Sequence, residues 1–454
     1  MKRLARGGSC AYIIGLLIAC GDDTAGSSGV AAQDPACSAP EPCEITERAC
    51  VDGILKLTAC ERGEDAPPLP EMRSITQAEF RAELLEEARD QESAPRHWDA
   101  ALQSLHLLPM GMSSMAADID VTATGVAAYF DGETKHITII TDARTDESAD
   151  SDTSQVNAMY VVSHELTHYL QDREFPLDDL LEEHGQGLDG SMSVRALVEG
   201  EAVVNSTRVL ARLSAVPSSN IRWSSVFASL DDSVLASVRA SVTPFHTAVL
   251  ILPYSIGTRY VAGVWTGYDH ARVTSLFSDH PTSLLDWFGG YGAGRLKPTL
   301  VEPLACAPPL APAGFKLVEL DSFGVTGVIG LLAAAGEPDL TTPRDLRADA
   351  IAVYVRTGAE PGPDSTLVVW RLRFSTEKAA NAFAQRLPWD DVGRRVIGKE
   401  LVLSAGPDVS RSALPDAVNT CPKLTELKPQ DSGVPIAAAR FLPPEPQLRL
   451  SLTE

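Results

Sequence analysis

The sequence predicts an α+β protein with three parts: a cysteine-rich N-terminal segment, a central domain, and a small C-terminal α+β domain. Three observations support this prediction. Four cysteines gather within residues 37–60, long helical patterns surround a β-hairpin pattern in the middle of the chain, and strand and helix patterns mix after a proline-rich stretch. We place the boundaries at 1–20 for a targeting segment, then 21–73, 74–300 and 301–454.

Charge narrows the classes of partner. The 454 residues carry a formal net charge of −23. An acidic balance disfavours nucleic acid as a partner, because phosphate contacts need Lys and Arg. The charge favours solubility, with binding of basic peptides as the alternative.

The N-terminus has the pattern of an exported protein. Basic residues precede an apolar run from Ala11 to Ala19 that is too short to span a bilayer. The run ends in LIACG, which resembles the bacterial lipobox, and that resemblance implies that Cys20 is lipidated and anchors the chain to a membrane. A plain secretory signal with an incidental cysteine is the alternative. The expected location is the cell envelope.

The cysteine count agrees with export. Of eight cysteines, Cys10 would leave with the signal and Cys20 would carry lipid, so an even number stays in an oxidising compartment. Four of these form a cluster that predicts two disulfides of open pairing: Cys37, Cys43, Cys50 and Cys60. A four-cysteine zinc site is the alternative, although the cluster lacks C-x-x-C. The other two, Cys306 and Cys421, are candidates to pair with each other.

The central domain begins with helical patterns over Ile75–Asp90, with Ser74 or Thr76 as N-cap, and over Trp98–Leu108. Gly125–Thr141 predicts a hairpin, because two β-rich runs surround Asp131-Gly132. His136 within it is expected to be structural. The acidic stretch Asp142–Asp152 predicts a solvated loop, with a Ca²⁺ site as the alternative.

The stretch Val156–Phe175 predicts a half-buried helix that carries the pattern H-E-x-x-H. Residues four apart share one face of a helix, so His164 and His168 could hold one Zn²⁺ ion through two ring nitrogens. Glu165 lies at the edge of that face, where its carboxylate could take a proton from a water molecule at the metal. Two surface histidines on an ordinary helix are the alternative.

Catalytic zinc needs a third protein ligand. The extended form with x-x-G-x-x-H fails here, because Gln171 and Glu174 occupy the glycine and histidine positions. A second predicted helix, Met192–Leu213, offers Glu199, and Gly200 beside it suggests close approach of a neighbouring helix. A solvated carboxylate is the alternative for Glu199. The rival ligands are Glu201, Glu182, Glu183 and His184.

HELTH followed by LVEGEA resembles the glutamate-ligand zinc metallopeptidases, the gluzincin branch of the zincins. In the aminopeptidase members the third ligand is the glutamate of an N-E-G-x-A helix, and Glu199-Gly200-Glu201-Ala202 matches that pattern. The resemblance covers about 125–294 and implies a substrate-pairing strand within the hairpin, against an ordinary core hairpin. Two positions depart: Val198 replaces the asparagine, and Val203 replaces an aspartate that orients a histidine in thermolysin-like members.

Related peptidases use a downstream tyrosine or histidine to stabilise the developing oxyanion. The resemblance implies Tyr254 for this role, with His246 and His280 behind it. A tyrosine packed in the core is the alternative.

The C-terminal part follows Pro303, Pro308, Pro309 and Pro312 and predicts the order α-β-β-α-β. The expected elements are a helix over 320–334, strands over 348–356 and 366–374, a helix over 376–386 capped by Ser375, and a strand over 394–404. No catalytic pattern occurs in them, which favours a supporting or substrate-presenting role. The tail, 422–454, is expected to be irregular.

Together these expectations describe a membrane-anchored zinc metallopeptidase, whose endo- or exopeptidase character stays open. The alternative is a catalytically silent zincin-fold lipoprotein that binds a partner at the envelope.

Overall fold

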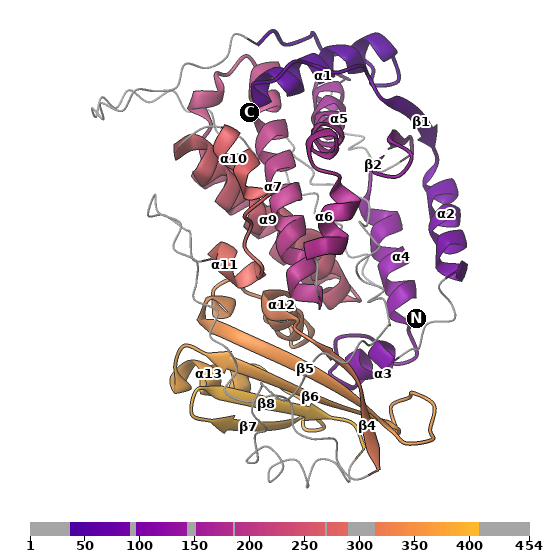
Figure 1. Ribbon diagram of the computed structural model, residues 1–454, viewed down its shortest axis with the longest axis vertical. Helices are drawn as coiled ribbons and strands as arrows, with labels where there is room; N and C mark the ends of the chain where they lie inside the picture. Colours follow the sequence, from indigo (N-terminus) through magenta and orange to yellow (C-terminus); the bar gives the residue numbers. More distant parts are fainter. Residues whose placement is uncertain are drawn as a thin grey trace, which may run out of the picture.

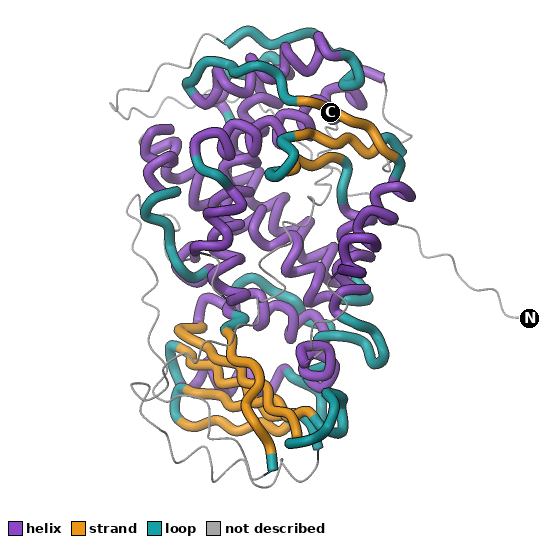
Figure 2. Tube along the Cα trace, turned by 45° about the vertical axis from the view of Figure 1, so that its right-hand side comes forward, coloured by secondary structure: helices purple, strands orange, loops and turns teal. Residues whose placement is uncertain are grey.

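The structure, a computed structural model, describes residues 37–90, 97–142, 151–184, 187–267, 270–288 and 314–407. The helices form one body that packs against a five-stranded sheet, and a small three-stranded sheet lies at the side of the helices (Figure 1). In Figure 2 the five-stranded sheet lies at the bottom, and the small sheet lies beside the upper part of the helical body. The predicted α+β class is confirmed. The lipobox with Cys20, the Cys306–Cys421 pair, most of the acidic loop, the boundary at 301 and the tail lie outside the described residues.

The helices are α1 (Arg48–Arg62), α2 (Gln77–Asp90), α3 (His97–Ser104), α4 (Ser114–Gly125), α5 (Ser151–Glu174), α6 (Leu177–His184), α7 (Gly187–Leu213), α8 (Trp223–Ala240), α9 (Pro244–Gly267), α10 (His270–Leu276), α11 (Leu284–Phe288), α12 (Gly324–Ala334) and α13 (Glu377–Arg386). The strands are β1 (Glu71–Ile75), β2 (Ala128–Asp131), β3 (His136–Ile140), β4 (Phe315–Asp321), β5 (Leu346–Arg356), β6 (Thr366–Phe374), β7 (Gly393–Ile397) and β8 (Glu400–Ala405). Within these described helices, none is long and apolar enough to cross a bilayer.

The N-terminal cysteines form the two predicted disulfides, Cys37–Cys60 and Cys43–Cys50. The two disulfides link α1, a helix that the sequence analysis did not predict, to the segment that precedes it. The apolar face of α1, which includes Val51 and Ile54, packs against β3 and α5 in one buried cluster. The cysteine-rich segment is therefore part of the core that surrounds α5.

The predicted hairpin is confirmed as β2 and β3, which pair antiparallel around the turn after Asp131. The strand β1, missed by the sequence analysis, adds to β3 in parallel, so the order is β1-β3-β2 and β2 lies at an edge. After β1 the chain enters α2 through a capping box. Thr76 Oγ1 accepts the Glu79 N–H at 3.2 Å and the Glu79 carboxylate accepts the Thr76 N–H at 2.7 Å, so Thr76 is the cap. The helix expected over 98–108 ends at Ser104, before the left-handed residue His106.

Two long helices, α7 and α9, form the centre of the helical body (Figure 1). Gly200 of α7 and Gly257 of α9 let their backbones meet: a Cβ added at Gly200 would lie 2.3 Å from the carbonyl carbon of Gly257. The predicted close approach at Gly200 is confirmed, and the neighbour is α9 rather than the histidine helix. This contact sets how near α9 lies to the metal-ligand candidates.

A proline within α9 creates a second link between these helices. Pro253 has no N–H, so the carbonyl of Val249, four residues earlier, loses its helical partner. The buried Arg195 of α7 donates to that carbonyl at 3.0 Å. The helix stays continuous and presents Tyr254 immediately after the proline.

The C-terminal sheet is antiparallel throughout, with strand order β4-β5-β6-β8-β7. The predicted order of elements is wrong at two places. Strand β4 occupies 315–321, so the helix starts at Gly324, and the strand expected over 394–404 is two strands joined by a turn at Gly398. The predicted cap of α13 is also wrong: Thr376, not Ser375, accepts the Ala379 N–H at 3.1 Å. The left-handed φ of 59° at Gly398 makes that turn.

The sheet and the helical body share one apolar core. Phe245 of α9 stacks on Phe323, whose ring meets Trp370 of β6, with centroid distances of 5.3 and 5.5 Å. Gly327 of α12 lies against the Trp370 ring, where a Cβ would come within 2.5 Å. The C-terminal sheet is thereby fixed to the helix that carries Tyr254.

Three aspartates lie where the start of α7 meets the C-terminal part. Asp321 accepts the N–H of Leu188, Asp189 accepts Ser283 Oγ, and Asp349 accepts the N–H groups at the start of α12. Burial, together with the neighbouring carboxylates, raises the pKa of Asp189 and that of Asp321 to about 7. The junction is therefore sensitive to pH.

The helix contact can be tested with a matched pair of glycines. Gly200→Ala should lower the free energy of unfolding by about 1–3 kcal/mol, because the new methyl group overlaps the α9 backbone. Gly263→Ala, at an exposed position of α9 with nothing within 4 Å of an added Cβ, should instead raise it by about 0.5–1 kcal/mol. Urea unfolding measures both. Equal effects of the two substitutions would contradict the close packing.

The aspartate junction predicts a stability that falls with pH. A carboxyl group whose pKa is raised on folding stabilises the protein at every pH below its pKa in the unfolded chain. This contribution is lost as the pH rises through the folded pKa of about 7. The free energy of unfolding should therefore fall by about 1–3 kcal/mol between pH 5 and 8, and less so in Asp189→Asn. Urea unfolding across this range is the measurement. The half-exposed Asp52→Asn on α1 serves as control and should leave the pH dependence unchanged.

Candidate metal centre

The helix α5 places both histidines of the H-E-x-x-H pattern on one buried face. The spacing of four residues brings His164 Nε2 and His168 Nε2 within 3.1 Å of each other. The two residues are 4% and 6% exposed. Two imidazole nitrogens therefore converge on one point inside the helical body.

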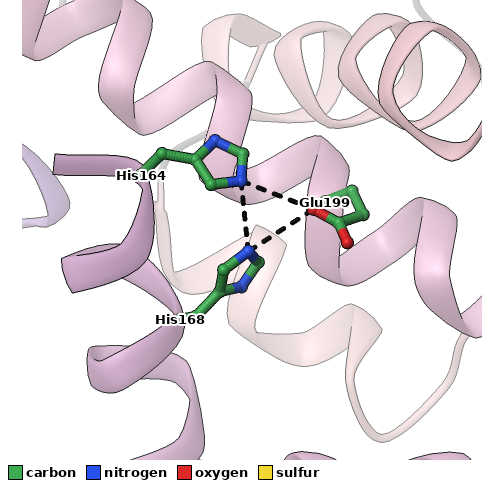
Figure 3. Close-up of side chains that lie close together, drawn as sticks. All are labelled: His164, His168 and Glu199. Carbon is green, nitrogen blue, oxygen red and sulfur yellow. Dashed lines mark hydrogen bonds and ion pairs between the residues drawn. The ribbon is translucent and has the colours of Figure 1, made fainter. Parts of the chain in front are cut away.

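Glu199 comes from α7, the helix beside α5, and completes the group (Figure 3). Its Oε2 lies 3.4 Å from each of the two Nε2 atoms. The three side chains form a buried group that could hold a metal ion, and it is the one such group among the residues that the structure describes. The sequence-predicted ligands are thus brought together, while metal binding stays a prediction.

The electrostatics of the group suit a cation. Burial lowers the pKa of His164, so the neutral ring with a free lone pair is favoured. Burial by itself would raise the pKa of Glu199, but the two imidazoles beside it outweigh that effect and hold the pKa well below its ordinary value. The group therefore combines two imidazoles with one carboxylate.

Behind His168 stands Gln171, one helical turn further along α5. Its Oε1 lies 2.7 Å from His168 Nδ1, the ring nitrogen that faces away from Glu199. Its Nε2 donates to the carbonyl of Val198 at 2.9 Å and to Glu201 Oε2 at 3.0 Å. In thermolysin-like members an aspartate at the position of Val203 orients a histidine. Here Gln171 of α5 contacts His168 instead.

Glu201 is fully buried and does not face the candidate ligands, so its role as a rival ligand is not supported. Its Oε1 accepts Arg62 Nε at 2.9 Å and His270 Nε2 at 2.7 Å. Burial would raise the pKa of Glu201, but Arg62 and His270 hold it well below its ordinary value. Glu201 is therefore a buried carboxylate with its own cationic partner.

Glu165 is 1% exposed and lies between α5 and the hairpin. Its Oε2 accepts the backbone N–H of Phe130 in the edge strand β2 at 2.9 Å. The hairpin therefore lies against α5, and its substrate-pairing role stays a prediction. The catalytic role of Glu165 stays a prediction.

Tyr254 is buried in α9, and its ring stacks on His164 with centroids 5.9 Å apart. The predicted oxyanion role is untested, but the residue lies beside the site. The two alternative candidates for this role have other surroundings. His246 packs on Phe245, and burial lowers the pKa of His246 to about 4. His280 Nδ1 lies 2.9 Å from the Pro281 carbonyl oxygen.

Two of the remaining rivals, Glu182 and Glu183, take no part in the group. Glu182 and Glu183 lie exposed on α6, and the His184 side chain is outside the described part. The sequence analysis missed Gln171, Arg62 and His270. A signal existed only for Gln171, which stands three residues after His168 on the same face.

Comparison with protein-family models, with curated proteins and with solved structures found no match. A functional conclusion therefore rests on the geometry of the site itself.

Metal titration tests the group directly. The wild type should bind about one divalent ion per chain, and His164→Ala or Glu199→Ala should weaken binding at least tenfold, because each removes one of three donors. Metal content after dialysis against a range of divalent ions is the measurement. His136→Ala in β3, paired with Glu71 away from the group, is the control and should bind as the wild type does.

Proposed function

We propose that the chain is a zinc-dependent peptide hydrolase, with a zincin-like arrangement of α5, α7 and the hairpin. The observation that carries this proposal is the buried convergence of His164, His168 and Glu199 with Glu165 adjacent in sequence. Two histidines and one glutamate form a ligand set of catalytic zinc sites.

The donor separations agree with zinc. Ligands about 2.0–2.1 Å from a tetrahedral ion lie about 3.3–3.4 Å from one another. The three donor pairs here are 3.1, 3.4 and 3.4 Å apart. The side chains therefore need little adjustment to hold the ion and leave one position open.

Zinc bound there would polarise a peptide carbonyl and make a water molecule easier to deprotonate. Glu165 is the base that takes the proton of the attacking water and gives it to the leaving amine. The Phe130 N–H holds one of the Glu165 oxygens. Tyr254, stacked on His164, is the candidate to stabilise the oxyanion.

The proposal includes an envelope location. The two disulfides agree with an oxidising compartment, and the lipobox pattern at Cys20 would tether the chain to a membrane. The substrate would then be a peptide or protein at that surface.

A catalytically silent envelope protein with a structural metal is the second candidate. The observation that favours it is the low exposure of the ligands, at most 6%. A structural zinc site is closed, whereas a catalytic one keeps a position open to substrate.

Glu165→Gln separates the two candidates. If the chain is a hydrolase, this variant should keep its zinc but lose about 10²–10⁴-fold in peptide cleavage, because the base is gone while the ligands stay. Zinc content and cleavage of a quenched-fluorescent peptide library are measured together. Glu183→Gln, an exposed carboxylate of α6, is the control and should cleave normally. A wild type that holds zinc but cleaves no peptide would favour the silent protein.

A further inference from the structure

The orientation of the Gln171 amide follows from its neighbours. The Val198 carbonyl and Glu201 Oε2, which lie 2.9 and 3.0 Å from Nε2, are both acceptors. The end of the amide between them must be the NH₂ group, which donates two hydrogen bonds. The carbonyl oxygen of the amide therefore faces His168 Nδ1, at 2.7 Å.

This orientation selects one tautomer of His168. An amide oxygen accepts but cannot donate, so Nδ1 must carry the ring proton. In the neutral ring, Nε2 then keeps its lone pair. That lone pair points at the site shared with His164 and Glu199, which lie 3.1 and 3.4 Å away.

The chain of contacts continues to an arginine from a distant segment. Glu201 Oε2 accepts from Gln171 at 3.0 Å while Glu201 Oε1 accepts from Arg62 Nε at 2.9 Å, so the arginine holds the glutamate that holds the amide. The Arg62 side chain is fully buried, and it enters from the last turn of α1, 139 residues before Glu201. The disulfide from Cys60 holds that turn to Cys37.

We infer that Arg62, Glu201 and Gln171 are positioning residues that fix the tautomer and orientation of His168 for metal binding. The inference rests on the proposed metal site and adds that the disulfide-held helix α1 belongs to the metal centre. Partners of this kind typically contribute tenfold to hundredfold to metal affinity. A purely structural network would contribute to stability and leave the affinity unchanged.

Two variants break the chain at different points. Gln171→Leu removes the acceptor of His168 Nδ1 but leaves the Arg62–Glu201–His270 contacts in place. Glu201→Gln keeps its amide oxygen against Arg62 and His270, which donate to that position, and therefore turns its NH₂ group toward Gln171. The Gln171 amide must then turn, which reverses the tautomer of His168. Both variants should lose about 10–100-fold in zinc affinity.

Asn205→Leu is the matched control. Like Gln171, Asn205 is a buried amide. It lies on α7 and joins the same three helices by donating to the Thr58 carbonyl of α1 and to Thr167 Oγ1 of α5. His168 Nδ1 pairs with Gln171 instead, at 2.7 Å. Loss of the Asn205 amide should lower the free energy of unfolding without changing zinc affinity more than about twofold.

Zinc affinity by chelator competition and unfolding of the metal-free protein are measured for the full chain and all three variants. Carbon-13 NMR with histidine-selective labelling reports the ring tautomer independently of activity. Wild-type affinity and tautomer in folded Gln171→Leu and Glu201→Gln would overturn the inference while the proposed function stands. A wild type that binds no zinc would overturn both. If Glu201→Gln fails to fold, Gln171→Leu decides.

Discussion

The constraint on which the rest of the structure depends is the burial of a carboxylate and two imidazoles at one point between α5 and α7. Three polar groups removed from water and lying within 3.4 Å of one another are costly unless a cation or protons balance them. The surroundings are arranged around this demand. The Gly200–Gly257 contact draws α9 against α7, so Tyr254 covers His164, and α1 closes the far side of α5.

The helix α7 carries two buried carboxylates only two residues apart, and each meets a different partner. Glu199 turns to the histidines, where a metal ion would supply the balancing charge. Glu201 turns to Arg62 and His270, which lie outside both metal-ligand helices. Gln171 lies between the two systems and contacts both, so their charge balance is linked through one amide. This arrangement gives a role to the buried Arg62 at the end of α1.

The sequence predicted those parts of the site that depend on local geometry. His164 and His168 follow from helix periodicity alone, and Glu199 was predicted from the need for a third ligand and from Gly200 beside it. The supports could not be predicted, because Arg62 and His270 reach Glu201 across 139 and 69 residues. The fold shows the same division. The hairpin and strand β6 were predicted, whereas β1 is short, polar and paired in parallel to a distant strand. The helix α1 lies within the cysteine-rich segment, where disulfides were predicted but a helix was not.

The position of Glu165 bears on whether the buried group is catalytic or structural. A structural metal needs its ligands and an apolar wall, and a further buried carboxylate beside them adds a desolvation cost of several kcal/mol without any gain in binding. Glu165 is nevertheless fully buried beside the ligand pair, and the backbone of an edge strand holds one of its oxygens. The same strand is the element with which an extended peptide could pair. The proposed proton transfer on a peptide would give this carboxylate a role, whereas a closed metal site gives it none.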